Sequence, residues 1–243
     1  MSTHPTHAML LAAGLGTRMR PLSSEVAKPM LPIGGRPIID HAIERLADAG
    51  VAELVVNTHY RADRLETHLA NVTPPPHVSF SREDELLETG GAVRAALPML
   101  SDAPFFVVNG DSMWLDGPST ALGRMQAAWS EEIDVLLLLY RSFQMQGGHV
   151  TGDFALDPWG VPRRPKEHEI VPYIYAGIQI VRPSFMATFP PGRFSMNRVW
   201  DAAIEAGRLH AIVHDGLWFH LSTPEDLRDA EFVLHASVVG ATT

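Results

Sequence analysis

The feature that most constrains the fold is a series of short apolar segments in which hydrophobic and polar residues do not alternate. Residues 135–140 are apolar throughout, and so are the four residues 105–108. A strand of this kind is buried on both faces, which is typical of a parallel sheet covered by helices. Between these segments lie stretches with helical spacing of apolar residues, such as 38–49. The alternation predicts an α/β fold with a mostly parallel, mixed sheet flanked by helices.

The same patterns predict the order of elements along the chain. Apolar segments without helical periodicity are expected to be strands, at 7–12, 53–58, 78–81, 105–108, 135–140, 173–181, 209–214 and 218–221. Amphipathic segments are expected to be helices, at 38–49, 61–70, 90–100, 119–129, 195–206 and from Thr223 onward. Residues 147–164 predict a hairpin that turns at 157–160. No linker or repeat is visible, so residues 1–243 are expected to form one domain.

Composition excludes several classes of function. The formal charge of −9 makes the chain a poor candidate for binding nucleic acid or an anionic membrane. The absence of cysteine excludes disulfides and thiolate metal sites. No apolar run approaches the roughly 20 residues of a membrane span, and residues 1–5 lack the pattern of a signal peptide. We therefore expect a cytoplasmic protein, as a monomer or a small homo-oligomer.

A glycine-rich segment follows the first predicted strand. Gly14 and Gly16 allow backbone N–H groups to approach phosphate oxygens, and Arg18 adds a bidentate donor. Of 19 basic residues only two are lysines, and one of them, Lys28, lies shortly after this loop. The loop lacks the Gly-Lys-Ser/Thr of a Walker A motif and the third glycine of a dinucleotide fingerprint. Taken alone, it fits either a phosphate-binding loop or a tight connection between a strand and a helix.

An acidic residue ends the strand predicted at 105–108. Asn109-Gly110-Asp111 follows four apolar residues, which places Asp111 at the carboxyl end of a buried strand. Ligands in open α/β sheets bind at this edge, and Mg²⁺ is usually held by one or two carboxylates together with phosphate and water. A solvated turn aspartate is the alternative.

Together these segments resemble the sugar-1-phosphate nucleotidyltransferase family. The resemblance rests on the string from Leu11 through Arg18 to Lys28-Pro29, and it continues at 86–92, at 109–111 and at 176–178. It covers nearly the whole chain. It implies a Rossmann-like fold of the nucleotide-diphospho-sugar transferase type, with a nucleotide-binding part at about 1–140 and a small sugar-binding part at about 141–243. It also implies that a nucleoside triphosphate and a sugar 1-phosphate are the substrates.

The resemblance assigns roles to individual residues. The catalytic residues it implies are Arg18, Lys28 and Asp111. The nucleotide-binding residues it implies are Ala12, Ala13, Gly14, Gly16, Thr17, Arg18, Lys28, Glu83, Thr89 and Gly90. Asn109 and Gly177 are expected to contact the sugar, and Asp111 and His220 to hold the metal, Mg²⁺ or alternatively Mn²⁺. An ordinary helix cap by Thr89 is the alternative for the segment that opens at Glu88.

The chain departs from the family pattern near its C-terminal end. Where the family usually has Trp-x-Asp-x-Gly-Thr-Pro, this sequence has His220 in place of the aspartate and Ser222 in place of the glycine. Imidazole is a poor ligand for Mg²⁺ and an acceptable one for Mn²⁺. His220 therefore has three possible roles: a metal ligand, a group that holds a metal-bound water or a phosphate, or a structural side chain. A second departure is Arg163-Arg164-Pro165-Lys166 in place of the family's Glu-Lys-Pro.

Two short segments narrow the expected substrates. Leu87-Glu88-Thr89-Gly90-Gly91 and Gly152-Asp153-Phe154 resemble N-acetylmuramate-1-phosphate uridylyltransferases of cell-wall recycling. Mannose- and heptose-1-phosphate guanylyltransferases have a similar loop, so UTP is favoured and GTP is the alternative. Glu83 lies where uridylyltransferases of the family often carry a residue that reads the base. A sensor that binds a nucleotide sugar without catalysis is the rival from another class.

Overall fold

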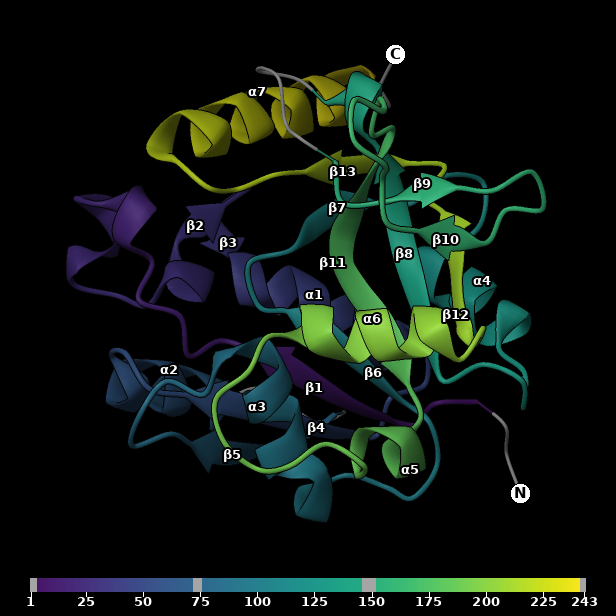
Figure 1. Ribbon diagram of the computed structural model, residues 1–243. Coiled ribbons are helices and arrows are strands. Elements are labelled where there is room, and N and C mark those ends of the chain that lie inside the picture. The colour runs from purple at the N-terminus through teal and green to yellow at the C-terminus, as the bar shows by residue number, and fades with distance from the viewer. Residues whose placement is uncertain (1–3, 72–75, 146–151, 241–243) are drawn as a thin grey trace.

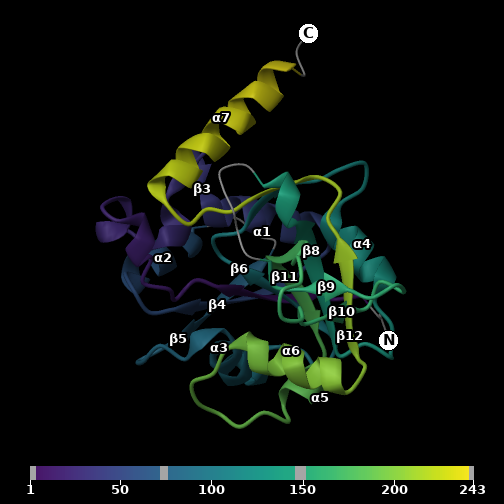
Figure 2. The ribbon, with the colours of Figure 1, turned by 45° about the horizontal axis from the view of Figure 1, so that its top comes forward.

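A mixed sheet of seven strands forms the centre of the computed structural model, which describes residues 4–71, 76–145 and 152–240. In order across the sheet, the strands are β12 (Leu209–Val213), β8 (Val135–Arg141), β11 (Tyr173–Val181), β6 (Phe105–Asn109), β1 (His7–Leu11), β4 (Glu53–Thr58) and β5 (His77–Arg82). Only β11 runs antiparallel to its neighbours in this sheet. Figure 1 and Figure 2 show this sheet at the centre of the molecule with helices on both of its sides.

Helices cover both faces of the sheet, as the non-alternating apolar strands require. One face packs against α1 (Ile38–Asp48), α2 (Ala62–Leu69) and α4 (Ala121–Ala128). The other packs against α3 (Glu88–Ala96), α5 (Pro183–Met186) and α6 (Met196–Glu205). Successive side chains of β1 serve the two cores in turn, with Leu10 in the first and Met9 in the second. The predicted fold class, a mostly parallel mixed sheet flanked by helices, is confirmed.

Short elements complete the chain. The pair β7 (Met113–Leu115) and β13 (Leu217–Phe219) leads toward α7 (Pro224–Gly240), which Figure 2 shows projecting from the body of the molecule. The strands β2 (Pro32–Ile33) and β3 (Arg36–Pro37) form a small hairpin near the start of α7. A third apolar cluster, which includes Ile33, Met113 and Leu227, joins these elements. Within the described ranges, no helix has the length and apolar character needed to cross a bilayer.

The hairpin expected at 147–164 is present where the structure describes it. The strands β9 (Ala155–Leu156) and β10 (Pro162–Arg163) pair antiparallel, and Asp157 accepts backbone hydrogen bonds within the turn. Residues 147–151 of that prediction lie outside the described residues. The helix expected at 90–100 is shorter than predicted, because α3 ends at Ala96 and a 3-10 turn containing Pro98 follows.

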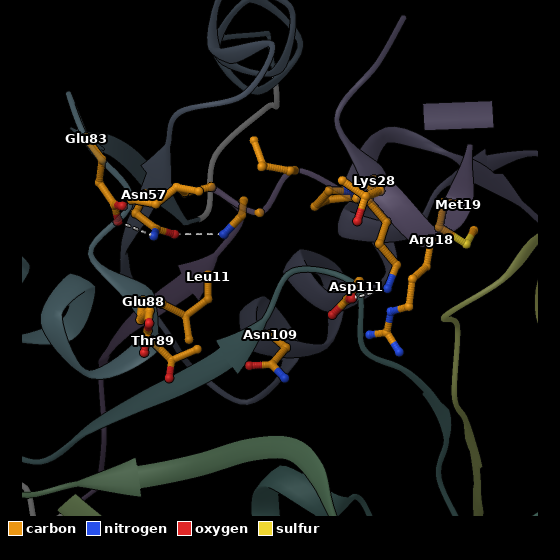
Figure 3. Close-up of a pocket in the computed structure, with 18 of the residues that line it drawn as sticks. Leu11, Arg18, Met19, Lys28, Asn57, Glu83, Glu88, Thr89, Asn109 and Asp111 are labelled. Atoms are coloured by element: carbon orange, nitrogen blue, oxygen red, sulfur yellow. Dashed lines mark hydrogen bonds and ion pairs between the residues drawn. The ribbon is translucent and has the colours of Figure 1, made fainter. Parts of the chain in front are cut away.

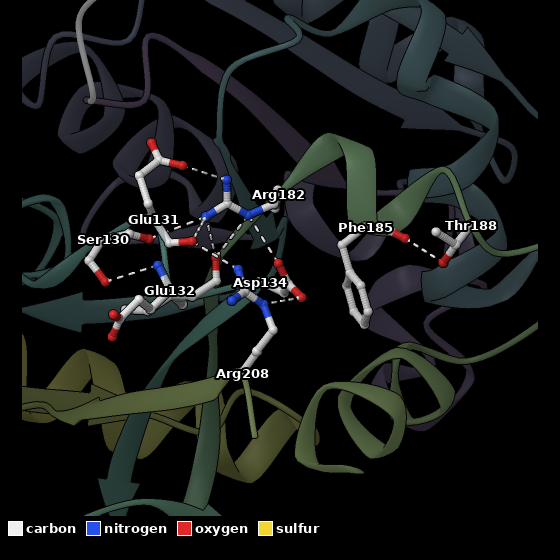
Figure 4. A network of polar contacts seen from close by, with 9 residues as sticks. Ser130, Glu131, Glu132, Asp134, Arg182, Phe185, Thr188 and Arg208 are labelled. Atoms are coloured by element: carbon white, nitrogen blue, oxygen red, sulfur yellow. Dashed lines mark hydrogen bonds and ion pairs between the residues drawn. The ribbon is translucent and has the colours of Figure 1, made fainter. Parts of the chain in front are cut away.

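An ion-pair network fixes the edge of the sheet far from β5 (Figure 4). Asp134, whose side chain is 8% exposed, accepts Nε of Arg182 at 3.0 Å and Nε of Arg208 at 2.8 Å. Nη1 of Arg182 donates to Oε2 of Glu131 at 3.0 Å. The three residues Asp134, Arg182 and Arg208 lie at the ends of β8, β11 and β12, so one carboxylate ties three strands together.

We expect Asp134→Asn to lower the free energy of unfolding by roughly 2–3 kcal/mol, the scale of lost hydrogen bonds to charged groups. Asparagine keeps the shape of the side chain but has only one acceptor oxygen. Arg182 and Arg208 each donate to a separate oxygen of Asp134, so one of these bonds is lost. Urea unfolding followed by circular dichroism measures the change. The matched control is Asp63→Asn, since the Asp63–Arg82 pair is exposed and should contribute little. Equal stability of both variants would show that the network is dispensable.

Candidate active site

A cavity of about 500 Å³ opens at the carboxyl ends of the central strands. The first loop leaves β1 there, and β4, β5 and β6 end beside it. Figure 3 shows side chains from these segments pointing into one space. Most of the residues predicted for nucleotide, metal or sugar binding lie in its wall: Ala12, Ala13, Gly14, Gly16, Thr17, Arg18, Lys28, Glu83, Thr89, Asn109 and Asp111. Gly90, Gly177 and His220 are not among the lining residues.

The loop after β1 is shaped by one glycine in a left-handed conformation. Gly16 has φ of 60°, and a Cβ there would lie 3.1 Å from Cβ of Lys28. Its carbonyl accepts the hydroxyl of Ser23 at 2.7 Å and the backbone N–H of Met19 at 3.0 Å. These bonds close the turn and bring Arg18 and Lys28 to the same end of the cavity (Figure 3). Gly16 is therefore required by close packing as well as by its φ.

Lys28 and Asp111 form an ion pair inside the cavity. The ammonium group of Lys28 donates to Oδ2 of Asp111, with side chains 12% and 34% exposed. Asp111 is carried by the turn after β6, and the N–H of Gly110 in that turn bonds to the carbonyl of Leu11 at 2.9 Å. The turn is thus anchored to the last residue of β1, directly before the glycine-rich loop. The carboxylate of Asp111 and two cations, Lys28 and Arg18, lie at the same end of the cavity (Figure 3).

The donor set around Asp111 fits a divalent cation that arrives with a phosphate ligand. The carboxylate of Asp111 supplies oxygen ligands, which Mg²⁺ prefers. The ammonium group of Lys28 lies beside this carboxylate, so the position already accommodates a positive charge. Among the described residues, no group of three or more His, Asp or Glu side chains converges to form a closed metal cage. A single carboxylate completed by phosphate oxygens and water is the usual arrangement for Mg²⁺.

His220 lies just outside the cavity and contacts a residue of its wall. Its Nε2 is 2.7 Å from Oγ of Ser222, and Ser222 lines the cavity. Burial is the main cause that lowers the pKa of His220; the charge of Asp226 opposes it, and the charges of Lys28 and Arg18 lower the pKa further. A neutral ring that bonds Ser222 is compatible with the structural role considered above. The role of holding a metal-bound water or a phosphate stays a prediction. Metal ligation by His220 stays a prediction.

The start of α3 is joined to a much later segment of the chain. Phe194 accepts the N–H groups of Gly90 and Gly91, both at 2.9 Å. The hydroxyl of Thr89 accepts the N–H of Met196 at 2.9 Å. The alternative of a Thr89 helix cap is therefore wrong, because α3 begins at Glu88 and the hydroxyl serves α6 instead.

We expect Gly91→Ala to lower the free energy of unfolding by about 1–3 kcal/mol, the usual range for overpacking. A Cβ at Gly91 would lie 2.2 Å from the carbonyl oxygen of Gly192, which is backbone and cannot rotate away. Gly14→Ala is the matched control, since a Cβ there meets nothing within 4 Å. Chemical denaturation of both variants measures the difference. An unchanged Gly91→Ala midpoint would mean that the later segment is not held closely against α3.

The two residues predicted to contact sugar differ in position. Asn109 lines the cavity, whereas Gly177 is not among the lining residues. Gly177 has φ of 78°, and a Cβ there would lie 2.1 Å from Oγ of Ser112 and 3.1 Å from Nδ2 of Asn109. It sits where the pairing of β11 with β8 shifts register. Gly177 therefore permits β11 to approach Asn109.

The basic side chains of Arg163 and Arg164 form contacts away from the cavity. Arg164 donates to Asp201 and to Asn197, both at 2.8 Å, and its guanidinium lies 4.7 Å from the ring centre of Phe154. Arg163 pairs with Glu169. None of the residues 163–166 lines the cavity.

The cavity also contains residues that sequence reasoning missed. Asn57 is 4% exposed, accepts the backbone N–H of Ala12 at 2.7 Å and lines the cavity. A signal was available, because Asn57 is a polar residue at the carboxyl end of an apolar strand. Arg193 also lines the cavity and pairs with Glu88 at 2.9 Å. It comes from the loop before α6, and no local pattern marks it.

The chain is similar to several known proteins. Residues 7–146 match the family described as nucleotidyl transferase. The chain is 39% identical to the N-acetylmuramate alpha-1-phosphate uridylyltransferase of Caulobacter vibrioides, over 95% of this chain and 98% of that protein. It is 32% identical to the protein of the same name from Neisseria meningitidis serogroup B, over 92% and 96%.

More distant similarities extend the comparison. A mannose-1-phosphate guanyltransferase of Emericella nidulans is 30% identical over 90% of this chain, which spans 61% of that protein. The crystal structure of HddC from Yersinia pseudotuberculosis superposes with a TM-score of 0.75 at 24% identity, covering 94% of this chain and 99% of that one. The match to the family model and the identities to full-length relatives lead to one conclusion: this chain belongs to the nucleotidyl transferase family.

Proposed function

We propose that this protein transfers a nucleotidyl group from UTP to N-acetylmuramate 1-phosphate and releases pyrophosphate. The observation that carries the proposal is one cavity in which a glycine-rich loop, Arg18, Lys28 and Asp111 meet at the carboxyl edge of the sheet. Relatives named for this reaction share 39% and 32% of aligned residues with the chain. The proposed setting is peptidoglycan recycling in the cytoplasm.

The proposed chemistry is an in-line displacement. A phosphate oxygen of the sugar 1-phosphate attacks the α-phosphorus of UTP, and the bond from that phosphorus to the bridging oxygen of pyrophosphate breaks. The attacking oxygen is already anionic, so the step requires no general base. Catalysis then consists of positioning the two phosphates and stabilising their charge.

Residues of the chain divide these tasks. The N–H groups of the loop from Ala12 to Thr17 hold phosphate oxygens. Arg18 and Lys28 stabilise the negative charge that moves onto pyrophosphate. Asp111 would hold Mg²⁺, with Mn²⁺ as the alternative, and a bound divalent cation would neutralise charge on the phosphates. Glu83, Thr89 and Gly90 remain proposed for the nucleotide side of the site, Asn109 and Gly177 for the sugar side, and His220 for the metal.

Pyrophosphate release tests the proposal. Each of the four ribonucleoside triphosphates is crossed with N-acetylmuramate, mannose, heptose and glucose 1-phosphates, in Mg²⁺ and in Mn²⁺. We expect release with UTP and N-acetylmuramate 1-phosphate. Release only with GTP and mannose or heptose 1-phosphate would establish a guanylyltransferase instead. A strong preference for Mn²⁺ would support His220 as a ligand.

A second candidate function is a sensor that binds a nucleotide sugar without catalysis. The replacement of the usual aspartate by His220 is the observation that favours it. The ion pair of Lys28 with Asp111 in the cavity favours the enzyme. Absence of pyrophosphate release with every pair, together with binding of a UDP-sugar measured by calorimetry, would identify the sensor.

A further inference from the structure

A chain of hydrogen bonds beside the cavity links three segments, and Figure 3 shows its central bond, between Asn57 and Glu83. Oδ1 of Asn57 accepts the N–H of Ala12 at 2.7 Å, and Nδ2 of Asn57 donates to Oε1 of Glu83 at 2.6 Å. Oε2 of Glu83 accepts the N–H of Leu87 at 3.0 Å. The chain of bonds therefore runs from the glycine-rich loop, through the ends of β4 and β5, to the residue before α3.

The side chains of Asn57 and Glu83 are buried, so loss of these hydrogen bonds is costly. Asn57 is 4% exposed and Glu83 is 7% exposed, yet both line the cavity. Ala12 follows the last residue of β1, and its N–H bonds to the Asn57 side chain. Leu87 directly precedes α3, so its N–H has no acceptor within the helix. Both N–H groups therefore need a side-chain acceptor. A buried donor left without an acceptor is costly. We infer that Asn57 and Glu83 are positioning residues, which hold the glycine-rich loop and the start of α3 at a fixed separation.

The pattern of donors and acceptors fixes the chemistry of both side chains. Leu87 and Asn57 each offer Glu83 an N–H, so Glu83 serves as an acceptor at both oxygens, as a carboxylate does. Glu83 in turn fixes which end of the Asn57 amide faces Ala12. Glu83 thus acts on the nucleotide through the backbone it holds, which differs from the direct reading of the base expected from its place in the sequence.

The inference rests on the proposed function for its substrate but has a test independent of turnover. Glu83→Gln replaces one acceptor oxygen by an NH₂ group, which must then face either the Asn57 amide NH₂ or the Leu87 N–H. Asn57→Asp places two carboxylates against each other. The double variant Asn57→Asp/Glu83→Gln restores every bond, because Asp accepts from Ala12 and from the Gln amide, and the Gln oxygen accepts from Leu87. Its net charge equals that of the native chain.

The experiment measures binding of α,β-methylene-UTP by calorimetry and the KM for each substrate in pyrophosphate release. We expect each single variant to weaken nucleotide binding by about tenfold or more, the scale of one unsatisfied buried hydrogen bond. The KM for the sugar 1-phosphate should change by less than about twofold, since the residues proposed for the sugar side, Asn109 and Gly177, take no part in these bonds. The double variant should return to within about threefold of the native affinity.

The matched control is Asn71→Asp/Glu44→Gln, which makes the same two substitutions at exposed positions and should bind as the native chain does. A double variant that binds as weakly as the single variants, or that fails to fold, would overturn the inference, because the exchange conserves every bond. A changed preference among UTP, CTP and GTP in Glu83→Gln would also overturn it, in favour of base reading. Native protein that binds the analogue but releases no pyrophosphate would instead contradict the proposed function.

Discussion

Asp111→Asn is expected to lower the rate of pyrophosphate release by at least about a hundredfold, the scale of removing one group that stabilises the transition state. Asparagine keeps the shape of the side chain and can still accept a hydrogen bond from Lys28. It removes the negative charge that a divalent cation needs, at the one carboxylate paired with Lys28 in the cavity. The kcat measured at saturating UTP and sugar 1-phosphate checks the effect.

The fold should survive this change, because Asp111 is about a third exposed and lies in a turn. Asp102→Asn makes the same substitution at an exposed position before β6, at the opposite end of that strand, and should keep the native rate. Native-like turnover in Asp111→Asn would remove the metal role from Asp111. It would also remove the main support for phosphoryl chemistry at this edge of the sheet.

Lys28→Ala is expected to lower kcat by at least about a hundredfold as well, because it removes a preorganised cation from the place where charge develops on the leaving pyrophosphate. The Lys28 side chain is only 12% exposed, so water cannot readily replace the ammonium group. The KM for UTP should rise less than kcat falls if Lys28 acts mainly in the transition state. Steady-state kinetics with varied UTP separates the two effects.

Arg36→Ala provides the control for loss of a positive charge, since Arg36 is exposed and pairs with Glu44 away from the cavity. The double variant Lys28→Ala/Asp111→Asn should lose less than the product of the single effects, because the two side chains contact each other. Strict multiplication of the two losses would indicate that Lys28 and Asp111 act independently.

The sequence predicted the fold well because its main signals are local. The apolar runs that became β6 and β8, and the helical spacing that became α1, each depend on residues close together in the chain. Errors occurred at element ends, such as the early end of α3, where Pro98 and the docking of neighbouring segments decide the boundary. The antiparallel direction of β11 is set by its neighbours in space, and no pattern within 173–181 reveals it.

The site was only partly predictable for the same reason. The glycine-rich loop and Asp111 have local signatures, so their shared cavity could be expected from the sequence. Arg193 reaches the cavity across the chain from the loop before α6, and nothing near it in the sequence marks that position. The engagement of both Glu83 oxygens is likewise visible only when three separate segments are seen together.

The contact of Phe194 with the start of α3 has a consequence for the order in which the protein matures. The bonds from Gly90 and Gly91 to Phe194, and from Met196 to Thr89, join residues more than a hundred positions apart. Such distant pairings form late, because a long loop must close before they are gained. The first part of the chain therefore carries the glycine-rich loop before Arg193, which also lines the cavity, is in place. The wall of the cavity is therefore complete only once the segment that carries Arg193 and Phe194 has docked on the start of α3.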